Sequence, residues 1–255
     1  MFGMKALFCI GNSHTASLWR GYNALVGAGK AGGFDTWKQI VIDPHFKAGG
    51  HTVGDAFDGA FAAIMSEVEV SEIFLCCGGA EHADIALFNI WPFDFYMPDD
   101  DPQQERIADS EVIPYDVMLA TCAAVISRSV PFVQRIRSLS SLPMYHILPP
   151  PPSAIADPAK AVLAPGFREM KDRYGFMPPR LRQRVWRVCC VAARQIYEEM
   201  GISIIEPPAE ALDENGFVAP QYQTLDMTHA NSAYGELVAS RMLSIAANHA
   251  SEVKG

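Results

Sequence analysis

Five short runs of apolar residues are spaced along the chain, and polar turns or stretches of helical periodicity separate them. The runs cover residues 6–10, 37–42, 72–77, 143–148 and 202–205. Each run is almost continuously apolar, which is typical of parallel strands that are buried on both faces. Apolar residues recur at helical spacing in segments 16–25, 55–66, 115–139, 180–200 and 233–248. The third of these segments, interrupted near Pro131, is predicted to be a long helix or a helix pair.

This alternation of strands and helices predicts an α/β fold with a mostly parallel, five-stranded sheet that is covered on both faces. Ligands of such sheets bind beyond the carboxyl ends of the strands. We find no internal repeat and no linker, so we expect one domain over residues 1–255.

Two segments, 88–114 and 153–179, do not fit the alternation and are predicted to be insertions. The first is aromatic and broken by prolines. We interpret it as a surface loop pinned by its aromatic residues, with a lid or an acyl-binding wall beside the site as the alternative. Within it, the acidic turn at 99–101 is predicted to be a solvated loop, because three consecutive carboxylates do not converge easily on one metal ion.

The composition is that of a globular protein, since 49% of the 255 residues are hydrophobic and 19% are charged. The formal net charge of −9 argues against non-specific binding to nucleic acid, which needs a basic surface. It does not indicate which small molecule is bound.

The cysteines and the N-terminus favour a cytoplasmic protein. Four of the six cysteines form two adjacent pairs and no CxxC occurs, so a disulfide framework is not expected. The positions are Cys9, Cys76, Cys77, Cys122, Cys189 and Cys190. The first predicted strand begins close to Met1, which leaves no room for a signal peptide. No apolar run approaches the length of a membrane span, so we expect no membrane partner.

Ser13 lies on a tight turn between the first predicted strand and the first predicted helix. Gly11 relieves crowding at such a turn, and the free N–H groups at the start of the helix point to where an anion would form. Ser13 is therefore either a nucleophile or only the N-cap of the helix, a position that serine commonly occupies.

A second candidate pair, Asp226 and His229, stands just before the last predicted helix. The spacing of three residues can place both side chains on one side of a turn. The carboxylate can then hold the Nδ1–H group of the imidazole and leave Nε2 free to accept a proton. In the alternative interpretation, Asp226 or Thr228 simply caps the helix.

No metal and no cofactor are expected. The remaining histidines do not show the spacing of a closed metal site. The glycine pairs at 49–50 and 78–79 belong neither to a GxGxxG pattern nor to a Walker A motif, so a nucleotide cofactor is not expected either.

Together these segments resemble the SGNH hydrolases, also called GDSL esterases. Gly11-Asn12-Ser13-His14 is similar to the first sequence block of the family, and Asp226-Met227-Thr228-His229 is similar to the last. The residues that follow, 230–235, resemble the continuation seen in many members. Gly78-Gly79-Ala80-Glu81-His82 falls where the third block belongs, and Gly50 falls where the second belongs.

The resemblance implies a three-layer α/β/α, flavodoxin-like fold and the hydrolysis of a small ester, which is expected to carry a small acyl group such as an O-acetyl group. It implies that Ser13 is the nucleophile, His229 the general base and Asp226 the residue that orients the base. The backbone N–H groups of Ser13 and Gly50 would bind the oxyanion. Gly49 and Gly54 are alternatives to Gly50.

Two residues depart from the family pattern. Asn12 replaces an aspartate, a mild change because an amide can also form the hydrogen bonds of a turn. Ala80 replaces an asparagine whose side chain donates to the oxyanion, and the loss of one such donor costs about 10²–10³ in rate. His82, His14 or Asn89 could replace this donor beside Gly79 of the third block. Alternatively, the chain is a weak or inactive esterase that binds a small ligand or a carbohydrate.

Overall fold

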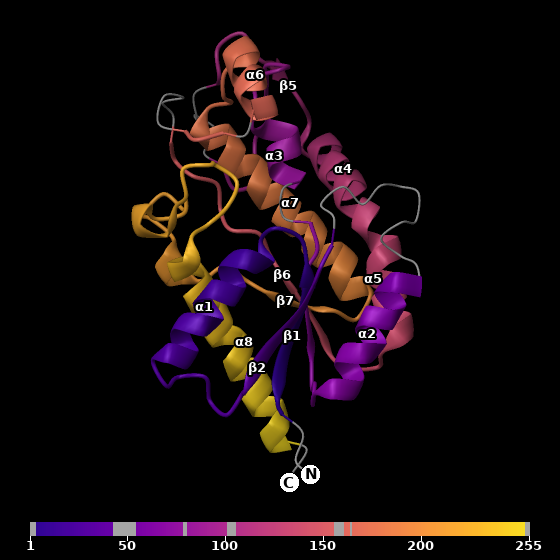
Figure 1. Ribbon diagram of the computed structural model, residues 1–255. Coiled ribbons are helices and arrows are strands. Elements are labelled where there is room, and N and C mark those ends of the chain that lie inside the picture. Colours follow the sequence, from indigo (N-terminus) through magenta and orange to yellow (C-terminus); the bar gives the residue numbers. More distant parts are fainter. Residues whose placement is uncertain are drawn as a thin grey trace.

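A sheet of five parallel strands forms the centre of the protein (Figure 1). The computed structural model describes residues 4–42, 55–78, 81–100, 106–155, 161–163 and 165–252. The strands are β1 (Ala6–Gly11), β2 (Thr36–Val41), β3 (Ile73–Cys76), β6 (Met144–Ile147) and β7 (Ser203–Ile205), in the order β2-β1-β3-β6-β7. Each strand coincides with a predicted apolar run. The predicted α/β fold with a parallel five-stranded sheet is confirmed.

Helices cover both faces of the sheet and make three layers (Figure 1). Side chains alternate along β1, so that Leu7 and Cys9 enter one apolar cluster while Phe8 and Ile10 enter another. The first cluster includes α1 (Thr15–Gly27) and α8 (Ser232–Glu252). The second includes α2 (Asp55–Glu67), α4 (Tyr115–Ile126), α5 (Val130–Leu139) and α7 (Pro179–Glu199).

The order of the strands across the sheet reverses between β1 and β3. The chain leaves β1 toward β2 on one side and later returns to β3 on the other side, and ligands of parallel sheets bind where the order reverses in this way. Asn12, directly after β1, donates from Nδ2 to the carbonyl oxygen of Gly78 over 2.5 Å. A Cβ on Gly11 would lie 2.4 Å from the carbonyl oxygen of Cys76, so only glycine allows this close approach.

The first predicted insertion, 88–114, contains a short parallel sheet that the sequence did not predict. It consists of β4 (Phe93–Asp94) and β5 (Glu111–Val112). Phe93 and Phe95 are buried in the core, whereas Trp91 is exposed and donates to Glu111 from its indole nitrogen over 3.2 Å. The segment is therefore pinned by aromatic residues, as predicted.

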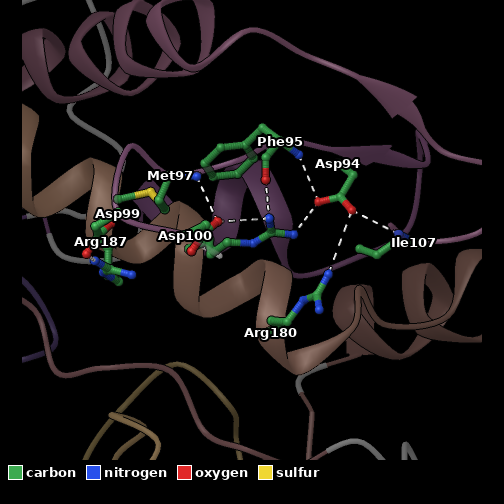
Figure 2. A network of polar contacts seen from close by, with 9 residues as sticks. Asp94, Phe95, Met97, Asp99, Asp100, Ile107, Arg180 and Arg187 are labelled. Carbon is green, nitrogen blue, oxygen red and sulfur yellow. Dashed lines mark hydrogen bonds and ion pairs between the residues drawn. The ribbon is translucent and has the colours of Figure 1, made fainter. Parts of the chain in front are cut away.

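A buried ion pair also holds this insertion against α7 (Figure 2). Asp94 is fully buried, pairs with Arg184, and accepts hydrogen bonds from the backbone N–H groups of Phe95 (2.8 Å) and Ile107 (2.9 Å). The removal of one partner of such a pair leaves an uncompensated buried charge, which is strongly destabilising. The Asp94–Arg184 pair and the hydrogen bonds around it, here called the clamp, therefore fix the position of the insertion against α7.

The acidic turn is also part of this clamp. Asp100 is largely buried, accepts a hydrogen bond from the backbone N–H of Met97 over 2.7 Å and lies 3.4 Å from Arg184. Asp99 pairs with Arg187 on the surface. The predicted solvated loop is wrong for Asp100, because its carboxylate compensates the buried arginine. Asp101 lies outside the described residues.

The second predicted insertion, 153–179, contains a helix that the sequence did not predict, α6 (Pro165–Tyr174). Its neighbourhood includes another unpredicted helix, α3 (Glu81–Ala86). Leu87, Phe88, Leu163 and Met227 form a small apolar cluster between these segments and the loop that precedes α8. The insertion thus reaches the region of the predicted Asp226–His229 pair.

The segment that forms α4 and α5, residues 115–139, is long and apolar enough to cross a membrane by length and composition alone. This contradicts the expectation that no apolar run approaches such a length. Met118 and Cys122 of α4, with Phe132 and Ile136 of α5, are buried in the core cluster that also contains α7. A core helix meets the same criteria, and here the inward face of the segment is packed against the protein.

Candidate active site

Ser13 is exposed at the carboxyl end of β1, immediately before α1. Its Oγ atom lies 2.8 Å from Nε2 of His229, although 216 residues separate the two along the chain. The N-cap residue of α1 is His14, and no side chain caps this helix. The structure therefore does not support the interpretation of Ser13 as only a helix cap.

Asp226 holds the other side of the His229 ring. Its Oδ2 atom lies 2.8 Å from Nδ1 of His229, and its Oδ1 atom accepts hydrogen bonds from the backbone N–H groups of Thr228 (3.0 Å) and His229 (2.9 Å). The Thr224 hydroxyl donates to the same oxygen over 2.8 Å. These bonds fix the carboxylate and the imidazole within one short loop.

The same contacts determine the charge of the Asp226 carboxyl group and the tautomer of the His229 ring. Burial alone would raise the pKa of Asp226, but the hydrogen bonds from His229, Thr224 and Thr228 outweigh burial and hold the pKa below its usual range. An ionised carboxylate can only accept, so Nδ1 of His229 carries the proton that it donates to Asp226. The lone pair of Nε2 then faces the hydroxyl of Ser13.

The N-cap of α8 is Asn231, and neither Asp226 nor Thr228 caps this helix. Oδ1 of Asn231 accepts hydrogen bonds from the backbone N–H groups of Ala233 (2.9 Å) and Tyr234 (3.2 Å). The sequence did contain this signal, since asparagine directly before an apolar-periodic segment is a common N-cap. Because Asn231 performs the capping, the Asp226 carboxylate remains available to His229.

Met227, between the two members of the pair, has a left-handed backbone with φ of +72°. This conformation is unfavourable for a residue with a long side chain, and such strain is often found at functional sites. The Met227 side chain is buried in the cluster with Leu87 and Leu163, which holds the strained loop in place. No local pattern indicated this residue, because its packing depends on the second insertion.

His14 lies beside His229, and the two ring centroids are 4.7 Å apart. Burial lowers the pKa of His14 to about 3, and the nearby His229 and His82 add to this effect. The ring therefore stays neutral at ordinary pH and forms a wall against the His229 imidazole. The sequence suggested His14 as an oxyanion donor, whereas the structure places its ring beside the His229 ring.

His82, on α3, is also buried and neutral. Burial lowers its pKa to about 4, with the Arg182 cation as a further cause, and its Nδ1 atom has no hydrogen-bond partner among the described residues. Together with Arg182 and Met227 it lines a cavity of about 10 Å³. Asn89, the third suggested donor, lies in the first insertion, where its backbone N–H donates to Gly175 over 3.1 Å.

The other predicted oxyanion-hole residues fall outside the part of the chain that the structure describes. These are Gly49, Gly50, Gly54, Gly79 and Ala80, and their roles stay predictions. Asn12 is buried, and its amide serves the turn: Nδ2 donates to Gly78, and Oδ1 accepts from the backbone N–H of His14 over 3.3 Å. Asn12 thus positions the turn that carries Ser13.

Ser13 carries the hydroxyl group that lies against the His229 ring. All six cysteines are buried free thiols, and burial with the nearby Glu81 raises the pKa of Cys76, at the end of β3, to about 12. No group of three or more His, Cys, Asp or Glu side chains among the described residues could hold a metal ion. The site therefore offers a serine hydroxyl, a base and a carboxylate in one hydrogen-bonded row.

No protein-family model matches the chain, and no curated protein matches it. Several solved structures are similar to it over most of their length. A GDSL-like lipase from Bacteroides thetaiotaomicron shares 12% identity with a TM-score of 0.45, covering 97% of this chain and 89% of that one. A carbohydrate acetylesterase from Sinorhizobium meliloti shares 10% with a TM-score of 0.43, covering 96% and 99%. An inhibitor-bound aryl esterase from M. smegmatis shares 10% with a TM-score of 0.42, covering 94% and 97%.

Proposed function

We propose that this chain is a serine esterase of the SGNH hydrolase family, with Ser13 as nucleophile, His229 as general base and Asp226 as the residue that orients the base. One observation carries the proposal. Ser13 Oγ lies 2.8 Å from His229 Nε2, and His229 Nδ1 lies 2.8 Å from Asp226 Oδ2. The three residues come from opposite ends of the chain and meet where the order of a parallel sheet reverses, a common position for ligand sites.

In the first half of the reaction, Ser13 Oγ attacks the carbonyl carbon of the ester while its proton passes to Nε2 of His229. The imidazolium that forms is stabilised by the Asp226 carboxylate. The tetrahedral intermediate carries its negative charge on the former carbonyl oxygen. The bond to the alcohol oxygen then breaks, the alcohol leaves with the proton from Nε2, and the acyl group stays on Ser13.

In the second half, water attacks the acyl carbon and gives a proton to the same nitrogen of His229. Ser13 Oγ leaves with that proton, and the carboxylic acid is released. The enzyme returns to its starting state, and no group beyond water is consumed.

The backbone N–H of Ser13 is available to bind the oxyanion. It donates to no acceptor within the described ranges, and it lies next to the attacking oxygen. The Gly50 N–H is proposed as a second donor. Because Ala80 cannot donate, we expect a weaker oxyanion hole than a three-donor site provides.

The acyl group of the substrate is proposed to be small. This proposal rests on the resemblance of the sequence motifs around Ser13 and His229 to those of the SGNH hydrolases.

Hydrolysis of a series of p-nitrophenyl esters by the wild type tests this proposal. We expect kcat/KM to be highest for the acetate and at least about tenfold lower for the octanoate, because the proposed acyl group is small. The Ser13→Ala protein gives the background rate. A preference for the octanoate would contradict the proposed acyl group, though not the esterase activity itself.

A second candidate function is that of a ligand-binding protein with the same fold. Ala80 favours this candidate, because its side chain cannot donate to an oxyanion. It predicts that folded wild-type protein turns over none of the esters in the series. Such a result, with binding of short carboxylic esters detected by calorimetry, would favour this candidate over the esterase.

A further inference from the structure

Two glycines bring the backbones of α1 and α8 into direct contact. A Cβ on Gly21 of α1 would lie 2.1 Å from the carbonyl carbon of Gly235 and 2.2 Å from the backbone nitrogen of Glu236. A Cβ on Gly235 of α8 would lie 1.9 Å from the carbonyl oxygen of Ser17. These neighbours are all backbone atoms, so no flexible side chain could move aside.

Glycine at these positions needs an explanation. In the interior of a helix, glycine is about 0.8–1.0 kcal/mol less favourable than alanine. Gly27, at the end of α1, has nothing within 4 Å of an added Cβ, so not every glycine of this helix is required by packing. At Gly21 and Gly235, the close approach of the two helices accounts for the choice.

The two helices carry the two sides of the proposed site. Helix α1 begins at Thr15, just after Ser13, and α8 begins at Ser232, just after the loop that holds His229. Ser17, which Gly235 touches, is one helical turn beyond Ser13. The separation of the helices at their crossing therefore sets the separation of nucleophile and base (Figure 1 shows α1 and α8 side by side).

We propose that Gly21 and Gly235 are positioning residues that hold Ser13 Oγ at 2.8 Å from His229 Nε2; this inference rests on the proposed esterase function. The Asp226–His229 pair lies within one loop on the α8 side, so its own geometry does not depend on the crossing. A change at either glycine should therefore break the contact between the helices and leave the contact within the loop intact.

The expected displacement is large enough to stop most of the reaction. To bring the Cβ of an alanine at position 235 into ordinary contact with Ser17, its distance must grow from 1.9 Å to at least 3.4 Å. A misplacement of about 1 Å in a catalytic constellation can cost about 100-fold in rate. We expect kcat to fall about 100-fold and KM to change less than about threefold, because the substrate still meets its binding walls.

Gly21→Ala and Gly235→Ala, assayed with p-nitrophenyl acetate beside two control variants, test the inference. Gly27→Ala makes the same substitution in α1 without a clash and should keep wild-type kcat. Val238→Ala removes buried bulk from α8 and should lower stability, measured by urea unfolding, without lowering the kcat of the folded protein. In the ¹H NMR spectra of all four variants, the downfield resonance of the His229 Nδ1 proton should remain, because the hydrogen bond to Asp226 is undisturbed.

The outcomes separate this inference from the proposed function. An active wild type with fully active, folded Gly21→Ala and Gly235→Ala proteins would overturn the positioning role and leave the esterase standing. The role is also overturned if both glycine variants fail to fold while both controls fold, since the crossing would then serve the fold alone. A wild type without turnover would overturn the esterase, and this inference with it.

Discussion

Replacement of Ser13 or His229 by alanine is expected to lower kcat for p-nitrophenyl acetate by about 10⁴–10⁶-fold. Without Ser13 no acyl-enzyme can form, and without His229 the hydroxyl has no base to take its proton. The two side chains act as one unit through their 2.8 Å hydrogen bond. The double variant should therefore be no slower than the slower single variant, and steady-state kinetics of all three proteins measures this non-additivity.

Asp226→Asn is a matched companion to these variants. It keeps the shape of the side chain, but it removes the charge that stabilises the imidazolium and the acceptor that fixes the Nδ1–H tautomer. A loss of about 10⁴ in kcat is expected. Losses that multiply in the Ser13 and His229 double variant, or an Asp226→Asn protein with wild-type activity, would show that the three residues do not work together.

The folded protein is expected to lose stability steeply between pH 6.5 and pH 4, because three buried histidines resist protonation. Burial lowers the pKa of His14 to about 3, of His82 to about 4 and of His146 to about 3. In the unfolded chain the ordinary pKa is about 6.5. Below that pH the unfolded state gains protons that the folded state cannot accept, so acid favours unfolding.

The size of this effect follows from the proton balance. Each histidine contributes about 2 kcal/mol to the loss at pH 5, and the three together contribute about 6 kcal/mol, which is comparable to the whole stability of a typical domain. Urea unfolding at pH 7.5, 6.5, 5.5 and 5.0 measures the free energy of unfolding directly. The lowered pKa of Asp226 acts in the same direction only at still lower pH.

A single variant tests the assignment to buried histidines. His146 lies on β6 and stacks on Tyr197, with ring centroids 4.0 Å apart. It takes no part in the proposed reaction. His146→Leu should reduce the loss between pH 7.5 and pH 5 by about one third, or about 2 kcal/mol, whatever its effect at pH 7.5. An unchanged pH dependence in this variant, or a flat profile in the wild type, would contradict the account.

The centre of the sheet could be predicted from the sequence because β1 and β3 are buried along their whole length. Both are continuous apolar runs with no competing signal, and the chain order of strands and helices then indicates the fold class. Strands β4 and β5 could not be predicted in this way, since two residues each are too few to show a period. Asp94, in β4, is a charged residue that a sequence pattern assigns to the surface, and only its pairing with Arg184 explains its burial.

The members of the proposed site were visible as two short motifs at opposite ends of the chain, and the structure brings them within hydrogen-bond distance. Their supports were not visible. Met227 can be recognised only from its left-handed backbone and its burial beside the second insertion. Gly21 and Gly235 stand 214 positions apart in the printed sequence, and nothing local shows that their helices touch. Properties that depend on tertiary approach cannot be inferred from local pattern alone.

Covalent labelling of the nucleophile tests the central claim most directly. The wild type would be treated with a fluorophosphonate, which traps an activated serine, and the site of modification would be located by peptide mass spectrometry. We expect a single adduct on Ser13, loss of esterase activity in proportion to labelling, and very slow labelling of His229→Ala. Ester hydrolysis that continues unchanged while Ser13 is fully modified, or inactivation by an adduct on another residue, would contradict the assignment of Ser13 as the nucleophile.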